Sequence, residues 1–211
     1  MSAFCGDAEA PGKRPGLAAD ELATPSRPLL MVDIDGVISL FGVALDGRGL
    51  PAREGSLQTI DGMPHFLSSS AAAHLLRLAD DYELVWASGW EERANEHLPH
   101  LLGLPPALPF LRFERALGRA HAHWKLAAIE RYAGARALAW VDDSFNDACH
   151  EWARARAAPT LLVATDPALG LTADEASLLA RWARDLARTP RAHDGAAHAS
   201  AARTASDTAA P

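Results

Sequence analysis

Two short acidic motifs directly follow apolar runs that could be strands of a parallel sheet. Asp33 and Asp35 leave the apolar run 29–32, and Asp142 and Asp143 leave a second apolar run. Ligands of parallel sheets bind beyond the carboxyl ends of the strands, so the four carboxylates are expected to meet in one crevice. Such a cluster needs a cation, and ligands that are all oxygen suit a hard divalent ion such as Mg²⁺. The ion would attract a phosphate group that bare carboxylates would repel.

The spacing of the first motif also predicts covalent chemistry. Asp33 and Asp35 lie two residues apart, so one carboxylate can attack phosphorus while the other gives or takes a proton. Gly36 permits the tight turn that follows. Ser88 and Gly89 leave another apolar run and would reach the same crevice. These residues predict hydrolysis of a phosphate ester through an aspartyl-phosphate.

The elements that must position these residues alternate between strands and helices. Short apolar runs suit strands that are buried on both faces of a parallel sheet, and they lie at 29–32, 83–87, 108–113, 137–141 and 160–163. Pro109 suits an edge position for the third of these. Helical patterns cover 65–80, 91–102, 121–133, 145–157 and a segment beginning near Thr172, where Glu175 completes a possible capping box. The alternation predicts an α/β fold with a doubly wound, mainly parallel five-stranded sheet.

The chain outside this alternation divides into three segments. Residues 36–62 are rich in glycine and turn residues, and they predict a small β-hairpin flap or cap over the first strand. Residues 1–27 and 190–211 have few large apolar side chains, which predicts a flexible N-terminal arm and a flexible C-terminal tail. The catalytic domain is therefore expected over 28–189.

Composition narrows the classes of function. The chain has 211 residues, 49% of them hydrophobic, and a formal net charge of −7, which argues against a broad, charge-driven nucleic-acid surface. Its two cysteines, Cys5 and Cys149, form no zinc-binding or disulfide pattern. We find neither an apolar run long enough for a membrane span nor a signal peptide. We expect a cytoplasmic protein that does not associate with a membrane.

Four stretches in this order resemble the haloacid dehalogenase (HAD) superfamily. They are LLMVDIDGV at 29–37, ELVWAS at 83–88, Lys125, and LAWVDDSFND at 138–147. The resemblance implies a HAD-like Rossmannoid fold and Mg²⁺ as cofactor. The acidic residue Asp35 is typical of the phosphatase branch, because general acid/base help suits an ester leaving group.

The resemblance implies a role for each matching residue. Asp33 would be the nucleophile and a magnesium ligand, and Asp35 the general acid/base with its backbone carbonyl on the metal. Asp142 would bind the metal, with support from Asp143 in its first or second coordination shell. The substrate-binding candidates are Ser88, Gly89, Trp90 and Lys125, of which Ser88 would bind the phosphoryl group and Lys125 would offset charge.

A narrower resemblance concerns the loops. Residues 85–98, 102–110 and 139–147 are similar to the HAD domain associated with bacterial "Swiss Army knife" RNA-repair proteins. This implies a nucleotide or polynucleotide end as the substrate, and another small phosphorylated molecule is the alternative.

Simpler structural roles compete with several of these assignments. Asp33 and Asp35 could form a turn, Asp142 and Asp143 could cap a helix, and Ser88 could cap the helix at 91–102. Trp90 could be packing. Lys125 could be solvated, with Arg112, Arg115 and Arg119 as other cations, and all nine His are interpreted as solvated or structural.

Two other functions remain open on the sequence. The short flap and the polar tails are compatible with a non-catalytic binding or scaffold domain. A phosphoryl switch of the response-regulator type would carry its acceptor Asp on the third strand, whereas this chain has the DxD motif on its first.

Overall fold

The main sheet consists of four parallel strands. The structure, a computed structural model, describes residues 27–42, 54–114 and 121–189. The strands are β1 (Leu29–Val32), β5 (Glu83–Trp86), β6 (Leu138–Asp142) and β7 (Thr160–Ala164). Their order is β5-β1-β6-β7, and each neighbouring pair is parallel. The predicted α/β class with a parallel sheet is confirmed.

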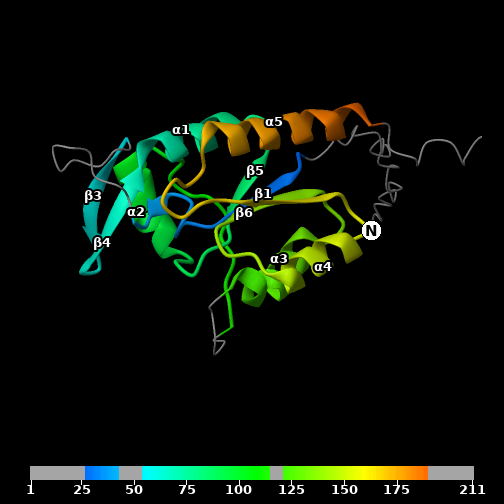
Figure 1. Cartoon of the computed structure of the whole chain (residues 1–211), viewed down its shortest axis with the longest axis horizontal. Coiled ribbons are helices and arrows are strands. Elements are labelled where there is room, and N and C mark those ends of the chain that lie inside the picture. The colour runs from blue at the N-terminus through cyan, green and yellow to red at the C-terminus, as the bar shows by residue number, and fades with distance from the viewer. Residues whose placement is uncertain (1–26, 43–53, 115–120, 190–211) are drawn as a thin grey trace, which may run out of the picture.

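Helices cover both faces of this sheet. α1 (Ser69–Leu78) and α5 (Ala173–Arg188) pack on one face, while α3 (Leu126–Ala133) and α4 (Asp147–Ala155) lie on the other (Figure 1). α5 begins with the predicted capping box of Thr172 and Glu175. α2 (Arg93–Leu102) lies at one end of the sheet, and the short 3₁₀ helix η1 (Ala122–Lys125) precedes α3.

Strand alternation divides the core into two layers. Leu30 and Val32 belong to the cluster under α1 and α5, whereas Leu29 and Met31 belong to the cluster with Ile129 of α3. All four β1 residues are fully buried, as expected for a central strand covered on both faces. The next side chain in this alternation, that of Asp33, therefore points to the layer of η1 and α3.

The predicted strand at 108–113, third of the five in chain order, is wrong. The segment 108–113 makes only one isolated bridge, between Trp86 and Phe110. The Trp86 N–H donates to the Pro109 carbonyl (2.8 Å), and the Leu111 N–H donates to the Trp86 carbonyl (2.9 Å). Trp86 is the last residue of β5, so the segment meets the sheet where its partner strand ends, and Pro109 has no N–H to extend the ladder.

A second, antiparallel sheet forms where a flap was expected. It contains β2 (Ser39–Leu40), β3 (Gly55–Ile60) and β4 (Met63–Ser68) in the order β2-β4-β3. We call these three strands the flap sheet. It lies beside α2 at one end of the main sheet (Figure 1).

The predicted helix over 65–80 begins too early. Phe66 and Leu67 lie in β4, where they pair with Leu40 and Ser39 of β2. The helix starts only after Ser68, whose hydroxyl accepts from the Ala71 N–H (3.1 Å). Phe66 and Leu67 are buried side chains of a strand. In the sequence their spacing to the apolar residues of α1 matched that of a helix, which led to the early start of the predicted helix.

Parts of the predicted domain plan cannot be compared with the structure. The arm before Arg27, the tail 190–211 and the flap residues 43–53 lie outside the described residues. No helix in the described ranges is both long and apolar enough to cross a membrane.

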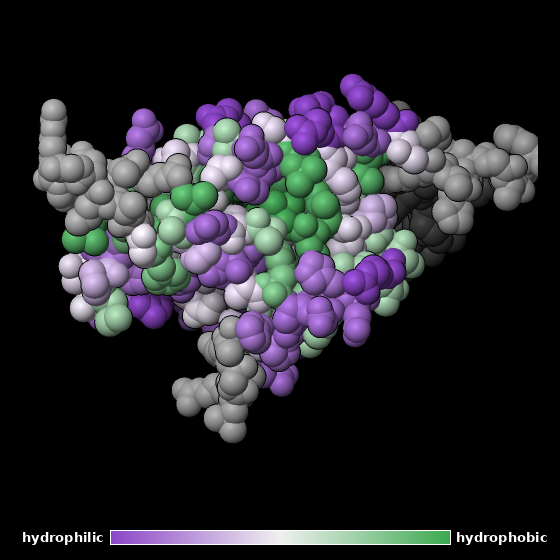
Figure 2. Space-filling view, in the orientation of Figure 1, coloured by the Kyte–Doolittle hydropathy of each residue, from purple (hydrophilic) through white to green (hydrophobic). Residues whose placement is uncertain are grey.

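The surface is mostly hydrophilic over the helices. Figure 2 shows apolar side chains gathered in the middle of the viewed face, between the hydrophilic surfaces of the helical layers. β7 is an edge strand of the main sheet, and its Leu161 and Leu162 are only partly buried.

Candidate metal and phosphate site

The sheet register places Asp33 beside Asp142. Val32 pairs with Val141 in the parallel ladder between β1 and β6, so the next residue on each strand is an aspartate. The Asp33 N–H donates to the Val141 carbonyl (3.0 Å) and continues the ladder to this point. The two side chains share the face of the sheet that η1 and α3 cover.

Lys125 connects these two aspartates. Its Nζ lies 2.8 Å from Asp33 Oδ2 and 2.7 Å from Asp142 Oδ2. All three side chains are buried. Lys125 ends η1, whose first residue Ala122 donates its N–H to the Ser144 carbonyl (2.9 Å) in the loop after β6. The lysine is therefore not a solvated helix residue.

Burial and charge oppose each other in this cluster. Burial raises the pKa of Asp33, Lys125 lowers it and Asp142 raises it, and the net result is a pKa of about 7. Burial lowers the pKa of Lys125, but the two aspartates outweigh this effect and raise it above its ordinary value. Lys125 is thus a fixed positive charge between two carboxyl groups.

A third carboxylate completes a group that fits a divalent cation. One carboxylate oxygen each from Asp33, Asp142 and Asp143 lie within 4.8 Å of one another. Burial, and then the charge of Asp142, raise the pKa of Asp143, and a bound divalent cation would oppose both effects by favouring the charged carboxylate. Oxygen donors of this kind suit Mg²⁺.

Gly36 is required for the approach of Asp143. Its φ is +72°, and a Cβ on Gly36 would lie 2.3 Å from Asp143 Oδ2. The Thr165 hydroxyl donates to the Gly36 carbonyl (2.9 Å), and the Thr165 N–H donates to the Asp142 carbonyl (3.1 Å). Thr165 thus joins the loops after β1 and β6.

Asp35 lies on the other side of the turn, beside Trp90. The Trp90 Nε1–H donates to Asp35 Oδ2 (3.0 Å), whereas Oδ1 is buried and has no hydrogen-bond partner among the described residues. Ser88 is 1% exposed, and its hydroxyl accepts from the Trp90 N–H at 3.4 Å. Gly89 is exposed. The Ala87 N–H donates to the Val32 carbonyl (2.8 Å), which holds this loop next to Asp33.

The competing capping roles are wrong. α2 begins after Glu92, so Ser88 does not cap it. α4 is capped by Asn146, whose side chain accepts from the Cys149 N–H, and not by Asp142 or Asp143. Asp142 Oδ1 instead accepts from the Ser144 N–H (3.1 Å) and hydroxyl (3.2 Å).

Arg112, and Asn95 of α2, make their described contacts with residues outside the acidic cluster. Arg112 is largely exposed and pairs with Glu91 and Glu92, and Arg115 and Arg119 lie outside the described residues. Asn95 accepts from Trp86 Nε1 (3.1 Å) and bonds both backbone groups of Leu108, so its described contacts join α2 to the following loop.

Sequence reasoning missed His65 and Thr165. His65 packs edge-on against Trp90. The apolar spacing predicted a helix over 65–80, and from a position on that helix the contact of His65 with Trp90 could not be predicted. Thr165 follows β7, so a search beyond every strand end would have found it.

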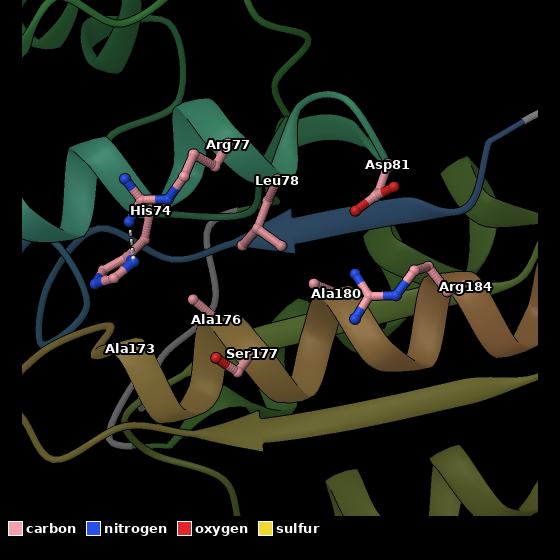
Figure 3. Close-up of a pocket in the computed structure, with 9 residues that line it drawn as sticks. All are labelled: His74, Arg77, Leu78, Asp81, Ala173, Ala176, Ser177, Ala180 and Arg184. Atoms are coloured by element: carbon pink, nitrogen blue, oxygen red, sulfur yellow. Dashed lines mark hydrogen bonds between the residues drawn. The ribbon is translucent and has the colours of Figure 1, made fainter.

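The groove in Figure 3 is separate from this cluster. It has a volume of about 370 Å³ and lies between α1 and α5. His74, Arg77 and Arg184 are among its lining residues, and none of the predicted site residues is.

Comparison with known proteins gives a match at the level of family. Residues 29–176 match the family described as the HAD domain in Swiss Army Knife RNA repair proteins. Searches of curated proteins and of solved structures found no match. The matched range covers most of the chain and contains both acidic motifs, Ser88 and Lys125. The chain therefore belongs to the family of HAD domains found in Swiss Army Knife RNA repair proteins.

Proposed function

We propose that this chain is a magnesium-dependent phosphatase that hydrolyses a phosphate monoester through an aspartyl-phosphate on Asp33. The observation that carries the proposal is the buried cluster in which Lys125 contacts both Asp33 and Asp142. Oxygens of Asp33, Asp142 and Asp143 lie close enough together to bind one metal ion. A carboxylate that is held by a fixed cation and has few conformations is suited to in-line attack.

Each residue has a distinct task in the proposed reaction. Asp33 attacks phosphorus, and the bond from phosphorus to the ester oxygen breaks while Asp35 gives that oxygen a proton. Water then attacks the aspartyl-phosphate and loses a proton to Asp35, which releases inorganic phosphate and restores Asp33. Lys125 offsets the negative charge of Asp33, and Ser88 donates a hydrogen bond to the phosphoryl oxygens.

Asp33, Asp142 and Asp143 would hold the Mg²⁺, with the backbone carbonyl of Asp35 as a further ligand. When bound, the ion supplies positive charge that draws in the phosphate and stabilises the charge that develops on it. We propose that the substrate is a phosphate on a nucleotide or polynucleotide end, because the family is named for RNA repair.

A panel of phosphate esters tests the proposal. It contains an aryl phosphate, nucleoside 3′- and 5′-monophosphates, and RNA and DNA oligonucleotides with a phosphate at either end. Release of inorganic phosphate is measured with Mg²⁺ and with a chelator. We expect turnover that needs Mg²⁺, and a loss of about 10⁴-fold or more in Asp33→Asn.

Asp185→Asn is the matched control, because Asp185 is an exposed carboxylate on α5 that pairs with Arg188. It should leave turnover unchanged. Protein quenched in acid during turnover should carry phosphate on the peptide that contains Asp33. Binding of Mg²⁺ without hydrolysis of any ester would favour a non-catalytic binding domain.

A further inference from the structure

Trp90 connects the flap sheet to the carboxyl group of Asp35. Its indole Nε1–H donates to Asp35 Oδ2 at 3.0 Å. On its other side the ring meets His65 of β4 edge-on, with centroids 4.9 Å apart and planes inclined at 71°. His65 Nδ1 in turn shares a hydrogen bond of 2.9 Å with the Ser39 hydroxyl of β2. Trp90 is 8% exposed as a whole residue, and its indole contacts both His65 of the flap sheet and Asp35.

The backbone that carries Trp90 is held in an unusual conformation. Glu91 has a φ of +50°, a left-handed conformation that costs a non-glycine residue free energy and persists where the surroundings impose it. The Glu91 N–H donates to the Ser88 carbonyl (3.1 Å), and the Glu91 carboxylate accepts from the Phe113 N–H (3.1 Å). The backbone next to Trp90 is therefore held by contacts that do not involve Asp35.

The hydrogen bond makes the two oxygens of Asp35 unequal. Oδ2 already accepts from Trp90, whereas Oδ1 is buried without a hydrogen-bond partner among the described residues. A buried oxygen that lacks a partner is costly, so its retention calls for a ligand or a function. Oδ1 is the carboxyl oxygen whose hydrogen-bonding capacity the described residues leave unused.

We infer that Trp90 is a positioning residue that turns Asp35 so that Oδ1 exchanges the proton with the substrate. This rests on the proposed function, in which Asp35 is the acid and base. The proton on Oδ1 passes to the ester oxygen as the bond from that oxygen to phosphorus breaks, and Oδ1 takes it back from the attacking water. His65 supports the indole from the flap sheet, so the flap also acts on Asp35 through Trp90.

Leaving-group dependence separates this role from simple packing. Trp90→Phe keeps an aromatic ring beside His65 and removes the N–H donor to Asp35, together with part of the ring volume. An alkyl phosphate needs a proton on its leaving oxygen, whereas an aryl phosphate with a strongly acidic phenol needs little help. We expect kcat to fall by about 10- to 100-fold for the alkyl ester and by less than about 3-fold for the aryl ester. His65→Ala should also lower kcat more for the alkyl ester than for the aryl ester, and both losses should be smaller than those of Trp90→Phe.

Trp152→Phe is the matched control. It removes an indole donor to a different carboxylate, since Trp152 Nε1 donates to Glu130 Oε2 at 3.1 Å on the surface. This variant should leave both rates unchanged. Equal losses for the two esters in Trp90→Phe would overturn the inference, because a merely structural role affects both alike.

A spectroscopic measurement tests the hydrogen bond without turnover. With ¹⁵N-labelled tryptophan, the signal that disappears in Trp90→Phe identifies the Trp90 indole N–H. In Asp35→Ala this signal should move upfield and exchange faster with solvent, while the Trp152 signal stays in place. An unchanged Trp90 signal would overturn the inference. A wild-type chain that binds Mg²⁺ yet hydrolyses neither ester would instead refute the proposed function.

Discussion

The floor of the site and its wall toward the flap sheet are held by different forces. The floor consists of three buried ionisable groups, in which Lys125 Nζ lies 2.8 Å from Asp33 Oδ2 and 2.7 Å from Asp142 Oδ2. The wall consists of Asp35, Trp90 and His65, which are joined by one hydrogen bond and one ring contact. Buried charges are costly unless every one keeps its partner, whereas a single hydrogen bond or ring contact can be lost without leaving a charge unpaired.

The two regions should therefore respond differently to substitution. Loss of one charge from the floor leaves the others uncompensated, so it should affect folding and chemistry together. Loss of one contact from the wall should affect the proton transfer and leave the fold nearly intact. The predictions below test this contrast, from the largest expected effect to the smallest.

Lys125→Met should give the largest loss of stability. It leaves Asp33 and Asp142 facing each other in a buried site, and removing one partner of a buried ion pair costs about 3–5 kcal/mol. Urea unfolding measures the change in the free energy of unfolding. Saturating Mg²⁺ should restore part of the loss, because an ion that binds the folded state and not the unfolded state stabilises the fold.

Arg188→Met is the control for this prediction. Arg188 pairs with Asp185 on the surface of α5, with side-chain exposures of 76% and 73%. Exposed pairs contribute little, so its loss should change the free energy of unfolding by less than about 0.5 kcal/mol. Equal effects of the two variants would contradict a charged, tightly held floor.

Gly36→Ala should come next in size. The new Cβ would lie 2.3 Å from Asp143 Oδ2 and 2.6 Å from Asp143 Cβ, so more than the tip of that side chain must move. Together with the positive φ, this should destabilise the fold by about 2–4 kcal/mol and weaken Mg²⁺ binding.

Gly62→Ala separates the backbone effect from the clash. Gly62 also has a positive φ, of +80°, but a Cβ there meets nothing within 4 Å. Thermal unfolding should show a loss of only about 1 kcal/mol, with Mg²⁺ affinity unchanged. A comparable loss of Mg²⁺ affinity in both variants would argue against the contact between Gly36 and Asp143.

The floor should also make stability depend on pH. Burial raises the pKa of Asp33 to about 7 in the folded chain, above its ordinary value of 3.8. Between these values the folded state holds a proton that the unfolded chain has lost. Stability from this group is thus complete below about pH 4 and is lost as the pH rises to about 7.

Asp33→Asn removes that loss. In chelator, the wild type should lose up to about 4 kcal/mol relative to Asp33→Asn between pH 4 and pH 7.5. Chemical unfolding of both proteins across this range measures the difference. Parallel pH profiles would show that the Asp33 carboxyl ionises in the folded state as easily as in water.

Arg93→Ala should have the smallest effect. Arg93 of α2 forms an ion pair with Asp61 at the tip of the hairpin between β3 and β4, and both side chains are about half exposed. The free energy of unfolding should change by no more than about 1 kcal/mol. Because Trp90 and His65 stay in contact, the ratio of alkyl to aryl phosphate hydrolysis should stay as in the wild type.

Much of the floor could be predicted from the sequence. The apolar runs before Asp33 and Asp142 indicated neighbouring strands, and a parallel register brings such residues together at one edge. Four of the five predicted strands are present in the main sheet. The run at 108–113 could not be judged in this way, because whether a strand pairs over one residue or several depends on where its neighbour ends.

The wall could not be predicted to the same degree. Trp90 was as compatible with packing as with a site, and His65 was placed on a helix because Phe66 and Leu67 continue the apolar spacing of α1. Helical and strand periods are hard to distinguish over a few residues. A strand and a helix of the same sequence turn different side chains inward, so a wrong assignment predicts the wrong contacts.

The sequence by itself determined the fold class and the acidic motifs at the strand ends, because apolar periodicity and residue type are local properties. Only the tertiary structure decided that Lys125 lies between Asp33 and Asp142 and that Trp90 holds one oxygen of Asp35. These contacts join residues 17 or more positions apart. Their geometry depends on how the helices and the flap sheet pack on the strands, which no local pattern encodes.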